Sequence, residues 1–355
     1  MNRRRYLKSV LFALLILMVI FGAAELLIRL AGLNPRVDNP FFMLVRVFEY
    51  PDYFEKDQTL FWRLRRNVDQ SHDFLVPGSY RTNSFGLRGG EVDLASLAGE
   101  TRIACLGNSC TFGWRLAEKD AYPGALQREL NTVSEQGQFV VFNCGVPGYS
   151  SYQGLHMLKI YQPALRPDYV TICYGWNDQW AGGFDIEDKD QQMAGQFLLD
   201  IQNMMSRSYL YRFIKYLLLA RYEKQRAYTF DRKSPRYRVS LQDYYDNLAA
   251  MVVYCRQQGI IPILVTAPVG DADPENDLPY EIYHRLYNQT VLAVAAELDV
   301  ALVDAAACFT DHPEFYDDTR TDYIHYNKRG AEWIAAQLAE LIDNYRAEMI
   351  DRYGE

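Results

Sequence analysis

The stretch TRIACLG at residues 101–107, followed directly by NSCTFGW at 108–114, decides the fold. The first segment is short and ends in an apolar run, which is typical of a strand buried on both faces. The run stops at Gly107, and Asn108 and Ser109 then open what we predict to be a helix. A serine at such a junction can be a helix N-cap or a nucleophile held at the end of a strand.

Four later segments repeat the buried-strand pattern. They are FVVFNCG at 139–145, DYVTICYG at 168–175, IIPILVTAP at 260–268 and VALVDAA at 300–306. Helical patterns lie between them, and alternation of strands with helices predicts a parallel sheet with helices on both faces. We therefore predict a three-layer α/β/α domain whose functional site lies at the carboxyl ends of the strands.

The clearest helix in this alternation is SLQDYYDNLAAMVVYCRQQG at 240–259. Ser240 with Asp243 is an N-cap pattern, and Gly259 is a C-terminal stop. The apolar residues of the stretch share one helical face; they are Leu241, Tyr244, Leu248, Met251, Val252 and Cys255.

Composition places the chain among globular proteins and argues against a nucleic-acid binder. Its 355 residues leave room for one large domain with extensions or for two small ones. The net charge of −8 is opposite in sign to the basic surface that nucleic acids require. We find neither zinc-type Cys/His spacing nor a phosphate-binding Gly-rich loop, and therefore expect no metal and no cofactor. Four histidines without ligand spacing are interpreted as structural or surface residues; they are His72, His156, His284 and His312.

The N-terminus predicts a membrane segment. Residues 1–10 carry three arginines and a lysine, and residues 10–24 are uncharged and mostly aliphatic. A span needs roughly 20 apolar residues, which residues 26–30 complete if Arg29 reaches toward the headgroups. We predict an uncleaved anchor over 1–32.

Two alternatives to the anchor stay open. One is a cleaved signal peptide ending at Gly22-Ala23-Ala24, and the other is a buried N-terminal helix. The anchor and the signal peptide both put the rest of the chain outside the cytoplasm, because positive charge before the apolar run favours an N-terminus inside.

The remaining chain divides by pattern. Residues 33–100 form an N-terminal extension of extended, turn-rich segments, and the main domain covers 101–345. Within that domain, residues 179–239 are too long for a plain connection and are interpreted as an insertion. Its part at 207–238 is strongly basic, with an apolar helix face. We interpret it as a lid or cap, with contact to anionic lipid or to an acidic glycan as the alternatives.

The six cysteines are interpreted mainly as small core residues. Cys105 and Cys173 lie in strand-like runs, and Cys255 lies on a helix face. Cys110 and Cys144 flank candidate site residues, and a bridge between these two remains an alternative.

Polar residues follow the predicted strands in order. The first strand is followed by Asn108 and Ser109, the second by NCGVPGYS with Gly145 and Gly148, and the third by YGWND with Asn177 and Asp178; Asp322 and His325 come near the C-terminus in RTDYIHYNKRG. The carboxyl ends of parallel strands lie at one edge of a sheet, so these groups are expected to gather there.

This set resembles the SGNH (GDSL-like) hydrolase family, in its membrane-anchored bacterial type, over roughly residues 101–345. Its four blocks supply Ser, Gly, Asn and His in this order, with Asp three residues before His. The resemblance implies a flavodoxin-like sheet and an esterase acting on ester bonds. The usual Asp before the nucleophile is Asn108 here, which we interpret as tolerated.

The resemblance also implies a role for each block. Ser109 is the nucleophile, His325 the general base and Asp322 its orienting acid. The oxyanion hole consists of the N–H groups of Ser109 and Gly148 and the side-chain amide of Asn177. Gly145 is the rival to Gly148, and Asp178 is expected to organise its own loop.

The leading hypothesis is an extracytoplasmic serine esterase of a bacterial inner membrane, single-pass with the N-terminus inside and a periplasmic catalytic domain. Its expected substrates are short acyl esters, O-acetyl above all, on cell-envelope or secreted polysaccharide. The alternatives are a polysaccharide O-acetyltransferase with the same triad, a lipase or lysophospholipase, and an inactive glycan-binding protein. The sequence identifies no protein partner.

Overall fold

The computed structural model describes residues 3–33, 52–70, 80–133, 138–180, 186–226, 237–270 and 279–353. The chain forms two compact units. The sheet unit comprises Arg63–Gln192 and Pro235–Glu355, and the helical unit comprises Met1–Trp62 and Met193–Ser234. The predicted insertion is therefore divided, because its two ends belong to the sheet unit and its middle to the helical unit.

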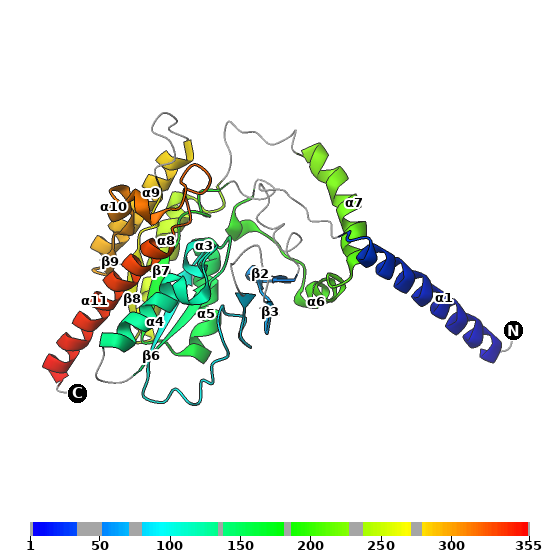
Figure 1. The fold of residues 1–355 in the computed structure, drawn as a ribbon, viewed down its shortest axis with the longest axis horizontal. Helices are drawn as coiled ribbons and strands as arrows, with labels where there is room; N and C mark the ends of the chain where they lie inside the picture. Colours follow the sequence, from blue (N-terminus) through cyan, green and yellow to red (C-terminus); the bar gives the residue numbers. More distant parts are fainter. Residues whose placement is uncertain are drawn as a thin grey trace. The chain divides into compact units, whose positions relative to one another are not determined.

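The sheet unit is built on a parallel five-stranded sheet in the order β6-β5-β7-β8-β9 (Figure 1). The strands are β5 (Thr101–Gly107), β6 (Phe139–Gly145), β7 (Tyr169–Cys173), β8 (Ile261–Val265) and β9 (Ala301–Val303). All five lie in the segments that the sequence predicts. Gly107 is in register with Gly145 and with Cys173, so three neighbouring strands end at one level.

Helices cover both faces of this sheet. On one face α4 (Tyr122–Val133) packs against α11 (Lys328–Tyr353), and on the other α5 (Ser151–Leu165) packs against α8 (Leu241–Gln257), beside α9 (Pro279–Glu297). Alternate residues of β5 serve the two layers: Ile103 and Cys105 join a core cluster with Leu126 and Leu338, while Leu106 is buried on the opposite side. The predicted three-layer α/β/α arrangement is confirmed.

Helix α8 follows its predicted pattern closely. The Ser240 hydroxyl accepts a hydrogen bond from the Asp243 N–H, and Gly259 beyond the helix has φ +72°. The predicted apolar face is buried except for Leu241, which lies in the first turn and is 36% exposed.

The chain also contains several shorter strands and helices. They are β1 (Phe54–Asp57), β2 (Phe61–Leu64), β3 (Asp69–Gln70), β4 (Tyr80–Arg81), α3 (Ser109–Phe112), η2 (Glu118–Asp120), η4 (Asp188–Asp190), α10 (Ala305–Thr310) and η5 (Pro313–Phe315). Strands β1 and β2 pair with each other, as do β3 and β4. His72 lies outside the described residues.

The helical unit contains α1 (Arg3–Leu30), α6 (Gln196–Met205) and α7 (Tyr209–Arg226). Glu25 of α1 satisfies the start of α7, because its carboxylate accepts hydrogen bonds from the Ser208 hydroxyl and from the N–H groups of Tyr209 and Leu210 at 2.7–3.0 Å. Within the basic stretch, Arg232, Lys233 and Arg236 lie outside the described residues.

Helix α1 is long and apolar enough to cross a membrane over Arg5–Leu30, with a mean hydropathy of 2.8. A signal sequence has the same length and composition. The side chains of this span are exposed, which contradicts the alternative of a buried N-terminal helix.

All six cysteines are free, so the alternative of a Cys110–Cys144 bridge is not realised. Burial raises the pKa of Cys105 and of Cys173 to about 12, which keeps both thiols protonated and unreactive. Their interpretation as core residues is confirmed.

Candidate active site

Ser109 lies two residues after the end of β5, at a tight turn into α3. The turn leaves no room for a side chain at Gly107. A Cβ on Gly107 would lie 2.0 Å from Thr111 Oγ1 and 2.8 Å from the Cys173 carbonyl oxygen. Glycine is therefore required where the strand turns sharply into α3.

The N-cap of α3 is Asn108 and not Ser109. The Asn108 Oδ1 accepts a hydrogen bond from the Cys110 N–H at 2.9 Å, which satisfies an orphan donor of the helix start. Ser109 is the first helical residue, and its hydroxyl is left free of the capping role. The helix ends after one turn at Gly113, whose φ is +85°, so a helix dipole adds little to the polarity at Ser109.

The side chains of Ser109, His325 and Asp322 form one hydrogen-bonded chain. Ser109 Oγ lies 2.8 Å from His325 Nε2, and His325 Nδ1 lies 2.9 Å from both carboxylate oxygens of Asp322. An ionised Asp322 requires the proton on Nδ1, which leaves the Nε2 lone pair to accept the serine proton. This is the geometry of a nucleophile, a base and an orienting acid.

The loop before α11 supports this arrangement. The Asp322 carboxylate also accepts the backbone N–H of His325 at 3.0 Å, so the loop turns around its own acid. Burial acts to raise the pKa of Asp322, but the hydrogen bonds and charge of His325 outweigh burial and hold that pKa below its ordinary value. Tyr326 donates its hydroxyl to the Cys110 carbonyl at 3.1 Å and thereby ties this loop to α3.

Two residues after α3 flank the triad and were not identified from the sequence. The Trp114 indole stacks on the His325 ring with centroids 5.7 Å apart. Arg115 Nη1 lies 3.5 Å from Asp322 Oδ2, and its side chain is 62% exposed. Arg115 also has φ +62°, a conformation that non-glycine residues seldom adopt. Their position five and six residues after Ser109 was the available signal.

Arg88 of the N-terminal extension holds the turn that carries these two residues. Its guanidinium is buried, stacks over the Phe112 ring, and donates to the carbonyls of Phe112, Gly113 and Leu116. The extension therefore holds the turn after α3 in place and is more than a connection. Nothing in the sequence around Arg88 distinguishes it from a surface arginine.

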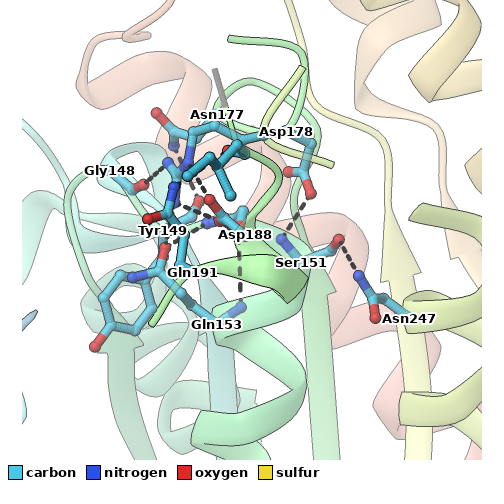
Figure 2. Close-up of polar contacts among 12 residues, drawn as sticks. Gly148, Tyr149, Ser151, Gln153, Asn177, Asp178, Asp188, Gln191 and Asn247 are labelled. Atoms are coloured by element: carbon cyan, nitrogen blue, oxygen red, sulfur yellow. Dashed lines mark hydrogen bonds and ion pairs between the residues drawn. The ribbon is translucent and has the colours of Figure 1, made fainter. Parts of the chain in front are cut away.

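The candidate oxyanion donors lie in the loops that follow β5, β6 and β7. In the turn after β6, the Tyr149 N–H donates to the Val146 carbonyl at 3.1 Å, and Gly148 has φ +86°. The Asn177 amide donates one N–H to the Tyr149 carbonyl at 3.0 Å (Figure 2). Within the described parts of the chain, the N–H groups of Ser109 and Gly148 donate to no other residue.

Gly145, the rival oxyanion residue, has a packing role. A Cβ there would lie 2.1 Å from the Phe112 backbone nitrogen, so glycine lets α3 pack against the end of β6. The positive φ at Gly148 explains the other glycine. The assignment of Gly148 as the donor stays a prediction.

Asp178 organises two loops. Its two carboxylate oxygens accept the N–H of Ser151 at 2.8 Å and the N–H of Gly175 at 3.0 Å, which ties the loop of Asn177 to the start of α5. Burial raises the pKa of Asp178 to about 6 against these hydrogen bonds and the nearby charge of Arg238.

We expect Asn177→Ala to lower kcat by about 10²–10³ while KM changes little, because the lost donor acts on charge that develops in the transition state. Asn247→Ala is the matched control, since Asn247 donates to the Ser151 hydroxyl at 3.1 Å and reaches no triad residue by that bond. Steady-state kinetics on both variants test this, and equal losses in both would contradict the role of Asn177.

His284 packs against the loop that carries Asn177. It is fully buried, stacks on Trp176 with centroids 3.7 Å apart, and pairs through Nε2 with the Ala267 carbonyl at 2.8 Å. Burial lowers the pKa of His284 to about 4, so the ring is neutral in the folded protein. Its interpretation as a structural histidine is confirmed.

This shift makes folding stability pH-dependent. The unfolded histidine titrates near 6.5, so the unfolded state binds the extra proton first, and stability contributed by His284 is lost as pH falls from about 6.5 to about 4. We expect the free energy of unfolding to fall by about 2 kcal/mol more in the wild type than in His284→Gln between pH 7 and pH 5. Urea denaturation at both pH values measures this difference. The raised pKa of Asp178 acts in the opposite direction but is common to both proteins and cancels. An equal fall in the free energy of unfolding between pH 7 and pH 5 in the two proteins would contradict the neutral buried ring.

The family model for the GDSL-like lipase/acylhydrolase family matches residues 105–333. A lipase/acylhydrolase from Enterococcus faecalis is 17% identical, covers 69% of this chain and 96% of its own, and has a TM-score of 0.45. An acetylxylan esterase from Geobacillus stearothermophilus is 19% identical over 68% of this chain and 92% of its own, with a TM-score of 0.43.

A GDSL-like lipase from Bacteroides thetaiotaomicron is 17% identical over 71% of this chain and 94% of its own, also with a TM-score of 0.43. No curated protein is significantly similar to the chain in sequence. Since the family model matches more than half of the chain, this protein belongs to the GDSL-like lipase/acylhydrolase family and is an ester-bond hydrolase.

Proposed function

We propose that the protein is a serine esterase that cleaves short acyl esters through a covalent acyl-enzyme. The observation that carries this proposal is the continuous hydrogen-bonded chain from Asp322 through His325 to the Ser109 hydroxyl. His325 takes the Ser109 proton as Oγ attacks the ester carbonyl, and it then gives that proton to the leaving alkoxide. Water then attacks the acyl carbonyl while His325 takes its proton; the bond to Ser109 Oγ breaks, His325 returns the proton to Oγ, and the carboxylic acid leaves.

Charge on the tetrahedral intermediate falls on the former carbonyl oxygen. The N–H groups of Ser109 and Gly148 and the free N–H of the Asn177 amide are the donors proposed to receive it. Asp322 balances the imidazolium that forms during each step, and its lowered pKa keeps it ionised.

The groups beside the triad favour a short acyl group on a polar carrier. Arg115 is exposed and charged at the acid, and Trp114 offers an amphipathic ring at the base. A long acyl chain would instead require an apolar channel. An O-acetyl group on a cell-envelope or secreted polysaccharide meets these conditions.

The proposed location is the outer face of a bacterial inner membrane, with α1 as an uncleaved anchor. Arg3, Arg4, Arg5 and Lys8 precede the apolar span, which favours an N-terminus inside. The far end of α1 is tied to α7, since Arg29 lies over the Tyr209 ring at 4.3 Å and Glu25 accepts the N–H groups of Tyr209 and Leu210. Cleavage of α1 as a signal peptide would remove these contacts with α7, so they favour an uncleaved anchor.

Hydrolysis of p-nitrophenyl esters by the full chain in detergent tests the activity. We expect acetate to be cleaved with a higher kcat/KM than octanoate, and Ser109→Ala to give the background rate. A preference for octanoate would contradict the short acyl substrate, and no hydrolysis by the folded wild type would contradict the esterase.

The accessibility of the sheet unit to protease added to spheroplasts tests the location. Protection of the sheet unit from the added protease would contradict a periplasmic domain.

A further inference from the structure

A buried ion pair lies behind the turn that carries Gly148. Arg238 is 2% exposed and Asp188 is 3% exposed. The two side chains meet in a bidentate pair, with Nε 3.0 Å from Oδ1 and Nη2 2.7 Å from Oδ2. Their backbones also pair, since the Asp188 N–H donates to the Arg238 carbonyl at 2.7 Å.

The remaining hydrogen bonds of this pair reach the turn and the helix start that follows it. Arg238 Nη1 donates to the Gly148 carbonyl at 2.6 Å, and Nη2 donates to Gln153 Oε1 at 2.6 Å. The Ser150 hydroxyl donates to Asp188 Oδ2 at 2.6 Å. Figure 2 shows Gly148, Gln153 and Asp188 gathered at one point of this network.

A buried ion pair is a poor way to gain stability, because desolvation of two charges offsets most of their attraction. An apolar pair of similar size would fill the same space. An arginine differs from it in holding a fixed fork of donors, which can set the position of several carbonyl and carboxylate oxygens together.

Gly148 is the residue that needs such a support. Its φ of +86° is a conformation that glycine adopts readily. Glycine also has the most flexible backbone, so this conformation is easily lost without support. An oxyanion donor contributes only if it is already oriented before the reaction. Arg238 holds the Gly148 carbonyl and Asn177 holds the Tyr149 carbonyl, so the two peptide groups that follow the Gly148 Cα are both fixed.

We propose that Arg238, oriented by Asp188, is a positioning residue that holds the Gly148 N–H in place for the oxyanion. This rests on the proposed function, in which Gly148 is an oxyanion donor. Both residues lie at the ends of the predicted insertion, just before and just after the part that enters the helical unit. The two ends of the insertion therefore support the proposed oxyanion donor of the sheet unit.

Three variants of the full chain in detergent test this, with Arg212→Met as the control. Arg238→Met removes the fork, Asp188→Asn weakens its orientation, and Arg238→Lys keeps the charge without the fork. The control removes a second arginine with little exposure, which pairs with Asp52 at 2.7 Å inside the helical unit. It matches the loss of a buried guanidinium and its ion pair without contact to the turn, although the Asp52 side chain is 47% exposed and that of Asp188 only 4%.

The first readout is hydrogen exchange of the peptide that spans 145–150. The Tyr149 N–H donates to the Val146 carbonyl, so its exchange reports closure of the turn. The Val146 N–H donates to the Gly107 carbonyl, so its exchange reports the attachment of the turn to the end of β5. We expect exchange there to be at least about tenfold faster in Arg238→Met and in Asp188→Asn, and unchanged in Arg212→Met.

The second readout is the division between kcat and KM on p-nitrophenyl acetate. We expect Arg238→Met to lower kcat by about 10–100-fold with KM within about twofold, since a misplaced donor fails mainly in the transition state. Arg238→Lys is expected to recover part of kcat. A merely structural role would lower thermal stability in Arg238→Met and Arg212→Met alike and leave kcat of the folded protein unchanged.

Unchanged exchange in the 145–150 peptide of folded Arg238→Met, or of Arg238→Lys if the first variant does not fold, overturns the proposal. Faster exchange with wild-type kcat also overturns it. If the wild type hydrolyses no ester, the proposed function fails, and the exchange comparison alone still decides whether Arg238 holds the turn.

Discussion

Ser109→Ala is expected to lower kcat for p-nitrophenyl acetate by about 10⁶, to a residual rate that comes from binding and the oxyanion donors alone. The variant loses the atom that attacks the ester, while the turn around it stays intact. Asn108 caps α3 through its own side chain, and Gly107 leaves the space that the Thr111 side chain occupies. Steady-state hydrolysis and thermal unfolding of the same preparations measure the two effects.

The control for Ser109→Ala is Ser206→Ala. Ser206 lies in the helical unit, where its hydroxyl donates to the Asn203 carbonyl at 2.7 Å. We expect this control to keep the wild-type kcat. A Ser109→Ala protein that retains more than about one hundredth of the wild-type rate would contradict a nucleophilic Ser109.

Asp322→Asn is expected to lower kcat by about 10⁴ without unfolding the protein. Asparagine has the shape of aspartate, but its amide group donates toward Nδ1 and so favours the proton on Nε2. The His325 ring then faces the Ser109 hydroxyl with a donor, and it cannot accept the serine proton. The substitution changes which ring nitrogen of His325 carries the proton, and it leaves the position of the ring nearly unchanged.

Arg115→Gln serves as the comparison for Asp322→Asn. Arg115 lies 3.5 Å from the carboxylate but is 62% exposed, so solvent weakens its influence on the acid. We expect a loss in kcat of less than about tenfold in this variant. Equal losses in Asp322→Asn and Arg115→Gln would contradict the role of Asp322 in fixing the tautomer.

The sheet and its order along the chain could be predicted because its signals are local. Each strand is a short apolar run that ends at a glycine or a polar block, and Ser240 with Gly259 brackets a complete helix. The length of α3 could not be predicted in this way. Its single turn ends because Gly113 adopts φ +85°, with Arg88 and Ala121 packed closely around it, and these contacts are not local.

The residues of the candidate site divide in the same manner. Ser109, Gly148, Asn177, Asp322 and His325 follow strands or share a short spacing, so a pattern of blocks reveals them. Arg88 and Arg238 have no such signal. Each reaches its carbonyl acceptors from a segment distant in sequence, and only the folded chain brings the guanidinium to the turn that it holds.

Labelling with a fluorophosphonate, followed by intact mass and peptide mapping, tests the central claim most directly. The reagent forms a phosphonyl ester only with an activated serine, and the full chain in detergent is the sample. We predict one label on the peptide that contains Ser109, loss of that label in Ser109→Ala, and strongly slowed labelling in His325→Ala. A folded wild-type protein that takes up no label, or one labelled at another serine with Ser109 unmodified, would contradict the assignment of Ser109 as the nucleophile.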